Sequence, residues 1–170
     1  MKAEGGKKIS SRTCRNPSSF ILPPSPGLRR TRPPSAFTAV LGVGVDIVET
    51  TRIRGSLAKF GDRFLNRCFL PGEVAYCRQM KFPELHFAAR FAAKEALSKA
   101  FGTGIGKQLG WKDIEIRKRD SGEPYAVLHG KGAALARARG VTEIFVSLSN
   151  CRDYSAAQAV IVGRSTTGKC

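Results

Sequence analysis

The sequence predicts an α+β fold in which an antiparallel sheet packs against a long helix and several shorter helices. Two observations favour this fold class. The periodic segments follow one another in the order strand, helices, hairpin, helix and hairpin, without an internal repeat. This order is expected of an antiparallel sheet with helices on one side. In addition, the length of 170 residues and the apolar fraction of 42% suit one globular domain, with or without a tail.

The folded part is expected to begin with a β-branched run, TAVLGVGVDIVE at residues 38–49, which predicts a buried strand. The residues after it carry Ile53, Leu57 and Phe60 at helical spacing, and Gly61 is expected to end this helix. A helix is therefore expected directly after the first strand.

The remaining segments complete the predicted order. Pro71 opens a short helix, and the main helix is predicted over residues 84–101. Two alternating runs on either side of the Asp-Ser-Gly sequence at residues 120–122 predict a hairpin. The last expected elements are a helix that ends at Gly140 and two strands, residues 143–150 and 154–162.

Residues 1–38 form a basic, proline-rich extension that we expect to be disordered. They hold eight Lys or Arg, six prolines and a single acid, Glu4, and proline at this density blocks helix and sheet. Three explanations stay open: a transit peptide, a basic arm for a polyanion, or a start assigned too early, with translation beginning near Val40. The apolar stretch FIL is too short for a signal peptide. The domain itself is expected over residues 39–163, followed by a short tail at 164–170.

The formal net charge of +16 favours a polyanionic partner. The extension contributes +7 of this charge, which leaves about +9 on the rest of the chain. Nucleic acid, an anionic membrane, phosphorylated small molecules and an acidic protein all fit, and charge alone does not choose among them. The five cysteines form no CxxC pair, which argues against a zinc site and for reduced thiols. No apolar run approaches the ~18 residues that a membrane span needs.

Asp46 is the first candidate for chemistry. The alternation of the strand puts it on the face opposite Val43, Val45 and Ile47, and the two glycines before it are expected to leave open space on its side. An aspartate in a buried strand is costly unless it is paired or bound to a metal. The alternative is an aspartate at the strand end that caps the following helix.

Glu95 is the second candidate, in the middle of the main helix. It shares a face with Phe91 and Lys99, one turn away on either side. An ordinary Glu–Lys pair is one interpretation, but the small and aromatic residues around it indicate a face that is not bare solvent. Two carboxylates from different elements, with cations nearby, suit magnesium, which takes oxygen ligands from one or two carboxylates and from substrate phosphates.

A glycine-rich loop, FGTGIGK, follows the main helix at residues 101–107. Its glycines permit positive φ and let backbone N–H groups approach an anion. The alternative is a helix C-cap followed by a flexible loop. The loop is neither a P-loop nor a dinucleotide fingerprint, because it lacks the GxxxxGK[ST] pattern and follows a helix.

Basic residues accompany these candidates. Three lie on the main helix and could grip phosphates: Arg90, Lys94 and Lys99. Four more are spaced along the early helical region and could face an acidic protein: Arg52, Arg54, Arg63 and Arg67. For any single one of them, a solvated charge is the alternative.

Four segments match one family in order and spacing: GVGVDIVETTRI, RFAAKEALSKAFGTGIG, DIEIRKRDSGEPY and VSLSNCRDYSAAQAVI. Together they resemble holo-acyl-carrier-protein synthase, the small bacterial type of 4'-phosphopantetheinyl transferase. The resemblance covers residues 40–162 and leaves the extension without a counterpart. It implies the fold of that family and an enzyme of fatty acid biosynthesis. Such an enzyme transfers the phosphopantetheine arm of coenzyme A to a serine of acyl carrier protein and releases adenosine 3',5'-bisphosphate.

The resemblance also implies roles for single residues. Magnesium would be held by Asp46 and Glu95, and Lys99 would act with them in catalysis as a phosphate contact. Coenzyme A would be bound by a larger set: Arg90, Lys94, Lys99, Gly102, Thr103, Gly104, Pro124 and Asn150. The acidic second helix of the carrier protein would meet Arg52, Arg63, Phe64 and Arg67. A homotrimer with sites shared between neighbouring subunits is implied, located in the cytoplasm, or in an organelle matrix if the extension is a transit peptide.

Two points stay open at this stage. Many relatives have histidine where this chain has Asn150, so a histidine-dependent contact or proton transfer is not expected there. The base that takes the serine proton could be Glu95 or a water molecule at the metal. The rival interpretation is a small basic nucleic-acid-binding domain, which explains the charge but leaves Asp46, Glu95 and the glycine loop unexplained.

Overall fold

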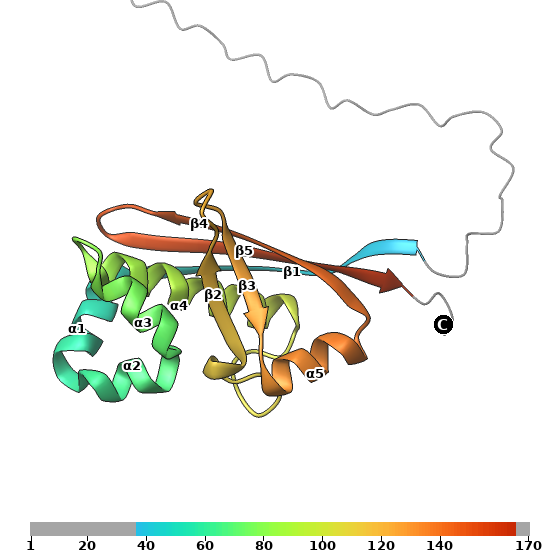
Figure 1. Ribbon diagram of the computed structural model, residues 1–170, viewed down its shortest axis with the longest axis horizontal. Helices are drawn as coiled ribbons and strands as arrows, with labels where there is room; N and C mark the ends of the chain where they lie inside the picture. Colours follow the sequence, from blue (N-terminus) through green and yellow to red (C-terminus); the bar gives the residue numbers. More distant parts are fainter. Residues whose placement is uncertain (1–36, 166–170) are drawn as a thin grey trace, which may run out of the picture. The chain divides into compact units, whose positions relative to one another are not determined.

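The computed structural model describes residues 37–165. Within this range the chain forms a three-stranded antiparallel sheet, a separate two-stranded hairpin and five α-helices (Figure 1). In chain order the elements are β1 (Phe37–Glu49), α1 (Thr50–Phe60), α2 (Asp62–Cys68), α3 (Pro71–Arg78), α4 (Pro83–Ala100), the short 3₁₀ turn η1 (Trp111–Asp113), β2 (Ile114–Lys118), β3 (Pro124–Leu128), α5 (Gly130–Ala138), β4 (Val141–Asn150) and β5 (Tyr154–Ser165).

The three-stranded sheet has the order β1–β5–β4, and each neighbouring pair is antiparallel. Helix α4 packs across β1 and β5, and α1 packs against α4. The hairpin β2–β3 joins the rest through contacts with α4 and β4 (Figure 1). The predicted α+β class, with an antiparallel sheet packed against a long helix and shorter helices, is confirmed. The hairpin forms a sheet of its own instead of extending the first one.

Small residues let α4 lie directly on the sheet. Ala88, Ala92 and Ala96 are completely buried. Across from the helix, a Cβ atom added at Gly44 would stand 2.0 Å from the backbone oxygen of Ala96, and one at Gly42 would stand 2.1 Å from that of Ala100. The expectation of open space beside these glycines is therefore wrong, because the backbone of α4 fills it.

The opposite face of β1 is exposed in the single chain. The predicted alternation is correct, since Val43, Val45 and Ile47 share one face and Asp46 lies on the other. However, these three side chains are 57%, 65% and 65% exposed, so the expected burial of the whole strand is wrong for this face. The physical reason is that α4 covers only one side of the sheet.

Most predicted boundaries are correct to within one or two residues. Gly61 ends α1 with φ of +48°, and Pro71 opens α3. Helix α2 was not predicted, because its seven residues are too few to show a helical period. β1 begins two residues inside the predicted extension, and β5 runs two residues into the predicted tail. The rest of the extension and the tail, residues 1–36 and 166–170, lie outside the described residues.

Three of the five cysteines lie in the described residues. Cys68 and Cys77 are buried and Cys151 is exposed, and all three are free. None of the helices in residues 37–165 is long and apolar enough to cross a membrane.

The contact between α4 and β1 predicts a strong effect of one methyl group. Gly44→Ala is expected to destabilise the protein by about 3 kcal/mol or more, because the new Cβ meets the backbone of α4, which can make room only by losing its close packing on the sheet. Gly55→Ala is the matched control: it lies within α1, and no neighbouring atom of the described part of the chain comes within 4 Å of the added Cβ, so it should raise stability by up to ~1 kcal/mol. Urea denaturation followed by circular dichroism measures both. Equal stability of the two variants would contradict the close packing.

Candidate functional site

Asp46 and Lys99 meet where β1 crosses α4. The Nζ atom of Lys99 donates to Asp46 Oδ1 at 2.7 Å and to the Val45 carbonyl oxygen at 3.2 Å. Among the described residues, Lys99 thus pairs with Asp46 and not with Glu95 one turn before it. Asp46 does not cap α1 either, because the N-cap position is Glu49 and no side chain of residues 37–165 forms a capping hydrogen bond there. The structure therefore excludes both alternative explanations, namely Asp46 as a helix cap and Glu95 as the partner of Lys99.

Glu95 lies near this pair, and the charges of Asp46 and Lys99 shift the pKa of its carboxyl. Burial raises the pKa of the Glu95 carboxyl, and the negative charge of Asp46 raises it further, while Lys99 and Arg52 act in the opposite direction. Two carboxylates from different elements thus lie near enough to repel each other in a partly desolvated place. Such a pair is stabilised by a cation between or beside its members.

The donor set fits magnesium. Carboxylate oxygens are hard ligands, and magnesium typically takes one or two of them and keeps its other positions for water and phosphate oxygens. Within residues 37–165 no group of three or more His, Cys, Asp or Glu side chains could hold a metal ion. A metal here would therefore depend on Asp46 and Glu95 together with oxygens from water or a ligand.

Lys94 does not face this site or any other surface. Its side chain is completely buried, and its Nζ atom donates to Glu73 Oε2 at 2.7 Å, to the Cys68 carbonyl oxygen at 2.8 Å and to that of Trp111 at 3.0 Å. Burial lowers the pKa of Lys94, and the carboxylate of Glu73 opposes that shift. The expectation that Lys94 holds phosphate is wrong, because all three donors of its ammonium group already have partners inside the protein.

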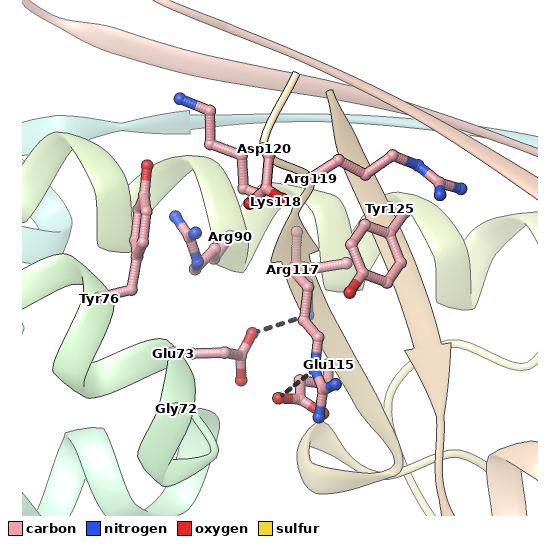
Figure 2. A pocket seen from close by; sticks show the side chains of 11 residues that line it. Gly72, Glu73, Tyr76, Arg90, Glu115, Arg117, Lys118, Arg119, Asp120 and Tyr125 are labelled. Carbon is pink, nitrogen blue, oxygen red and sulfur yellow. Dashed lines mark hydrogen bonds and ion pairs between the residues drawn. The ribbon is translucent and has the colours of Figure 1, made fainter. Parts of the chain in front are cut away.

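Arg90 lines a cavity of about 450 Å³ between α3, α4 and the hairpin (Figure 2). The guanidinium carbon lies 4.1 Å from the centre of the Tyr76 ring, and Figure 2 shows the two side chains next to each other. Arg90 is only 5% exposed, its Nη1 atom donates to the His86 carbonyl oxygen at 3.4 Å, and its Nε atom has no hydrogen-bond partner among residues 37–165. A guanidinium group at the wall of a cavity is suited to bind an anion.

A second, smaller cavity of about 200 Å³ shares Arg90 with the first and is also lined by Pro124 and Asn150. Three of the residues expected to bind coenzyme A thus come together from α4, β3 and β4. The walls also include residues that the sequence analysis missed, namely Tyr76, Arg117 and Lys118. Tyr76 lies in α3, and Arg117 and Lys118 are adjacent in β2; nothing in their local sequence indicates that they line the same cavity as Arg90.

The two clusters lie on different faces of α4. At 100° per residue, Glu95 is about 140° and Lys99 about 180° around the helix from Arg90. One chain therefore does not bring the residues of the cavity together with the carboxylates at β1.

The loop after α4 has the predicted backbone conformation. Gly102 and Gly104 have φ of +64° and +61°. Their N–H groups, however, donate to the carbonyl oxygens of Lys99 and Ser98, and the N–H of Thr103 also donates to Ser98. In this conformation the loop is a helix C-cap, and these N–H groups are not free for an anion.

The basic residues expected to meet an acidic protein fall into two places. Arg63, Phe64 and Arg67 of α2 line one hollow of about 330 Å³ together with Trp111. Arg52 lies on α1, near enough to Glu95 to lower the pKa of that carboxyl.

Comparison with known proteins gives one consistent result. The family model described as the 4'-phosphopantetheinyl transferase superfamily matches residues 42–159. A holo-acyl-carrier-protein synthase of Chlamydia trachomatis is 49% identical over 121 residues, which are 71% of this chain and 98% of the relative. The crystal structure of holo-acyl-carrier-protein synthase from Neisseria meningitidis is similar, with a TM-score of 0.69 and 32% identity over 72% of this chain and 98% of that one. The crystal structure of Helicobacter pylori holo-acyl-carrier-protein synthase in complex with coenzyme A is also similar. Its TM-score is 0.64, and it is 31% identical over 70% of this chain and 98% of that one.

The raised pKa of Glu95 predicts a pH-dependent effect on stability. The folded state holds the Glu95 proton more tightly than the unfolded chain does, so the ionised carboxylate destabilises the fold above the raised pKa. This destabilisation disappears as the pH falls through that pKa to below the ordinary value. Without divalent metal, Glu95→Gln should therefore have a higher Tm than the wild type at about pH 7.5, and the difference should vanish near about pH 4.

Thermal melts in the presence of a chelator measure this difference. A lower Tm of Glu95→Gln at neutral pH, or a difference that does not change with pH, would contradict the assigned environment of Glu95.

Proposed function

The chain belongs to the 4'-phosphopantetheinyl transferase superfamily, and we propose that it works as a holo-acyl-carrier-protein synthase. It transfers the 4'-phosphopantetheine group from coenzyme A to a serine of apo acyl carrier protein and releases adenosine 3',5'-bisphosphate. The observation that carries the proposal is the meeting of Asp46, Glu95 and Lys99 at one point, in a chain that spans 98% of a relative of that name. A nucleic-acid-binding role is not favoured, because it gives this cluster no purpose.

Asp46 and Glu95 are the residues that would hold magnesium. When bound, the ion supplies positive charge that neutralises the diphosphate of coenzyme A and orients its oxygens. Lys99, already bonded to Asp46, adds a second positive charge at the same place. Preorganised charge of this kind supplies most of the catalysis in phosphoryl transfer.

The transfer itself breaks one bond and forms one. The serine Oγ atom attacks the β-phosphorus of coenzyme A, and the bond from that phosphorus to the oxygen shared with the α-phosphate breaks. The serine proton passes to a base at the junction of β1 and α4. Glu95 lies at this junction and is one candidate for the base, and water is the alternative acceptor.

The cavity at Arg90 would take the nucleotide end of coenzyme A. Three cations in its walls, Arg90, Arg117 and Lys118, support this assignment, although Arg117 is also paired with Glu115. Pro124 and Asn150 line the adjoining part. Gly102, Thr103 and Gly104 would contribute only if their N–H groups exchange their present partners for the ligand.

The separation of the two clusters around α4 supports a shared site. Arg90 of one subunit would act with Asp46 and Glu95 of a neighbour. The apolar face formed by Val43, Val45 and Ile47, more than half exposed in the single chain, is suited to self-association. A homotrimer built on this face would complete three such sites.

The α2 surface would receive the acidic carrier protein. Arg63 and Arg67 are exposed and flank the partly buried Phe64. This surface, with cations on either side of an apolar side chain, is complementary to an acidic helix that carries an apolar residue. Arg52 would contact the same partner close to the carboxylates.

Transfer is tested directly by mass spectrometry of apo carrier protein incubated with coenzyme A, magnesium and this protein. The carrier should gain the mass of one phosphopantetheine group. Asp46→Ala and Glu95→Ala should each lower the rate by about 10²–10³-fold or more, because each removes part of the charge that stabilises the transition state. Glu143→Ala, on the exposed part of β4, is the control and should retain activity. No mass gain with folded wild-type protein and several carrier proteins would overturn the proposal.

Shared sites predict that two inactive variants rescue each other. Arg90→Ala and Asp46→Ala should each be weakly active alone. After unfolding and refolding an equal mixture, random assembly leaves about a quarter of the shared sites with both residues intact, and activity should rise to about that fraction of the wild type. The absence of any rise in mixtures shown to contain mixed trimers would contradict sharing.

A further inference from the structure

Glu73 and Lys94 form a buried ion pair that the proposed reaction does not use. Their Oε2 and Nζ atoms are 2.7 Å apart, and the side chains are 1% and 0% exposed. Lys94 directly precedes Glu95 on α4. A buried ion pair contributes little to stability by itself, because removing two charges from water offsets most of their attraction. Its presence here therefore calls for another explanation.

The pair joins five segments of the chain. Lys94 donates to the carbonyl oxygen of Cys68 at the end of α2 and to that of Trp111 in η1. Glu73, in α3, accepts from the N–H of Leu70 at 2.8 Å and from that of Ile116 in β2 at 3.0 Å. All of these partners are backbone groups at helix ends, in the 3₁₀ turn or in the hairpin, so two apolar side chains could fill the space but could not hold them.

The joined segments carry the proposed substrate surfaces. Cys68 and Trp111 line the hollow on α2, together with Arg63 and Arg67. Glu73 and Ile116 line the cavity at Arg90 (Figure 2). In Figure 2 a dashed line marks the hydrogen bond that joins Glu73 to β2. The ion pair thus lies beneath both surfaces and anchors both to α4, the helix that carries Glu95 and Arg90.

We propose that Glu73 and Lys94 are positioning residues for the transfer: they fix the α2 docking surface and the hairpin wall of the coenzyme cavity on α4. This inference rests on the proposed function. Hydrogen bonds at fixed angles, unlike apolar contacts, hold each of these surfaces at a set position on α4. In a shared site the α2 surface of one subunit works with the coenzyme cavity of its neighbour, so the pairs of both subunits together set the distance between the docked carrier serine and the phosphorus it attacks. Both side chains are almost completely buried, so they would act through the segments that they hold.

The proposal predicts a particular kinetic signature. Each surface is built by its own local residues and should still bind when the pair is broken, but the two substrates would no longer be aligned. In Lys94→Met and in the milder, isosteric Glu73→Gln, kcat per folded subunit should fall about tenfold or more, because small misplacement of reacting groups is costly. The KM values for carrier protein and coenzyme A should change by less than about threefold, since the binding surfaces themselves remain.

The control separates positioning from stability. Leu109→Ala removes a completely buried side chain that lines neither substrate surface, so it should lower the Tm while kcat per folded subunit stays within about twofold of the wild type. The folded fraction is measured by circular dichroism at the assay temperature, and transfer is followed by mass spectrometry of the carrier. If Lys94→Met does not fold, the kcat per folded subunit of Glu73→Gln is the result that tests the positioning role.

Two negative results are distinguishable. An active wild type with Glu73→Gln at unchanged kcat per folded subunit would overturn the positioning role. So would a loss of kcat in Leu109→Ala as large as in Glu73→Gln. An inactive wild type would instead overturn the proposed function and with it this inference.

Discussion

The direct contact between α4 and β1 is the constraint on which the candidate site depends. Gly42 and Gly44 have no side chains, so the helix backbone comes within the distance that a Cβ atom would occupy. At this separation a short aspartate on the strand reaches the lysine on the helix, at 2.7 Å, and affects the neighbouring glutamate. A larger residue at either glycine would move α4 outward and draw the carboxylates apart. The contact between α4 and β1 thus packs the core and also brings Asp46 close to Lys99 and Glu95.

Helix α4 uses its three cations in three different ways. Lys99 faces β1 and pairs with Asp46, and Arg90 faces the cavity under the hairpin. Lys94 points into the protein and joins segments that are far apart in the sequence. This division explains how a core helix can carry several charges: each one is paired, aimed at a cavity or anchored to backbone groups. In the proposed function, the position of Arg90 and Lys99 on different faces of α4 is the reason that the two ends of one coenzyme molecule are assigned to two subunits.

The sequence was sufficient for the fold class and for the carboxylate pair, because both leave local signals. Alternation in the first strand put Asp46 opposite Val43, and helical spacing put Glu95 and Lys99 on one face. The sequence did not predict that Lys94 is buried. A helical period does not show that this lysine pairs with Glu73, 21 residues earlier, inside the core. The exposed face of β1 was missed for a related reason. A β-branched run indicates an apolar environment, but the pattern does not say whether the same chain or a second copy supplies it.

The central claim is that β1 and α4 together form one metal site from Asp46 and Glu95. Titration of Mn²⁺ followed by electron paramagnetic resonance, in the presence of coenzyme A, tests it most directly and does not depend on turnover. We expect the wild type to bind one ion per site, and Asp46→Asn and Glu95→Gln each to abolish this binding while the fold persists. Retained Mn²⁺ binding in either folded variant would contradict a site shared by the two carboxylates.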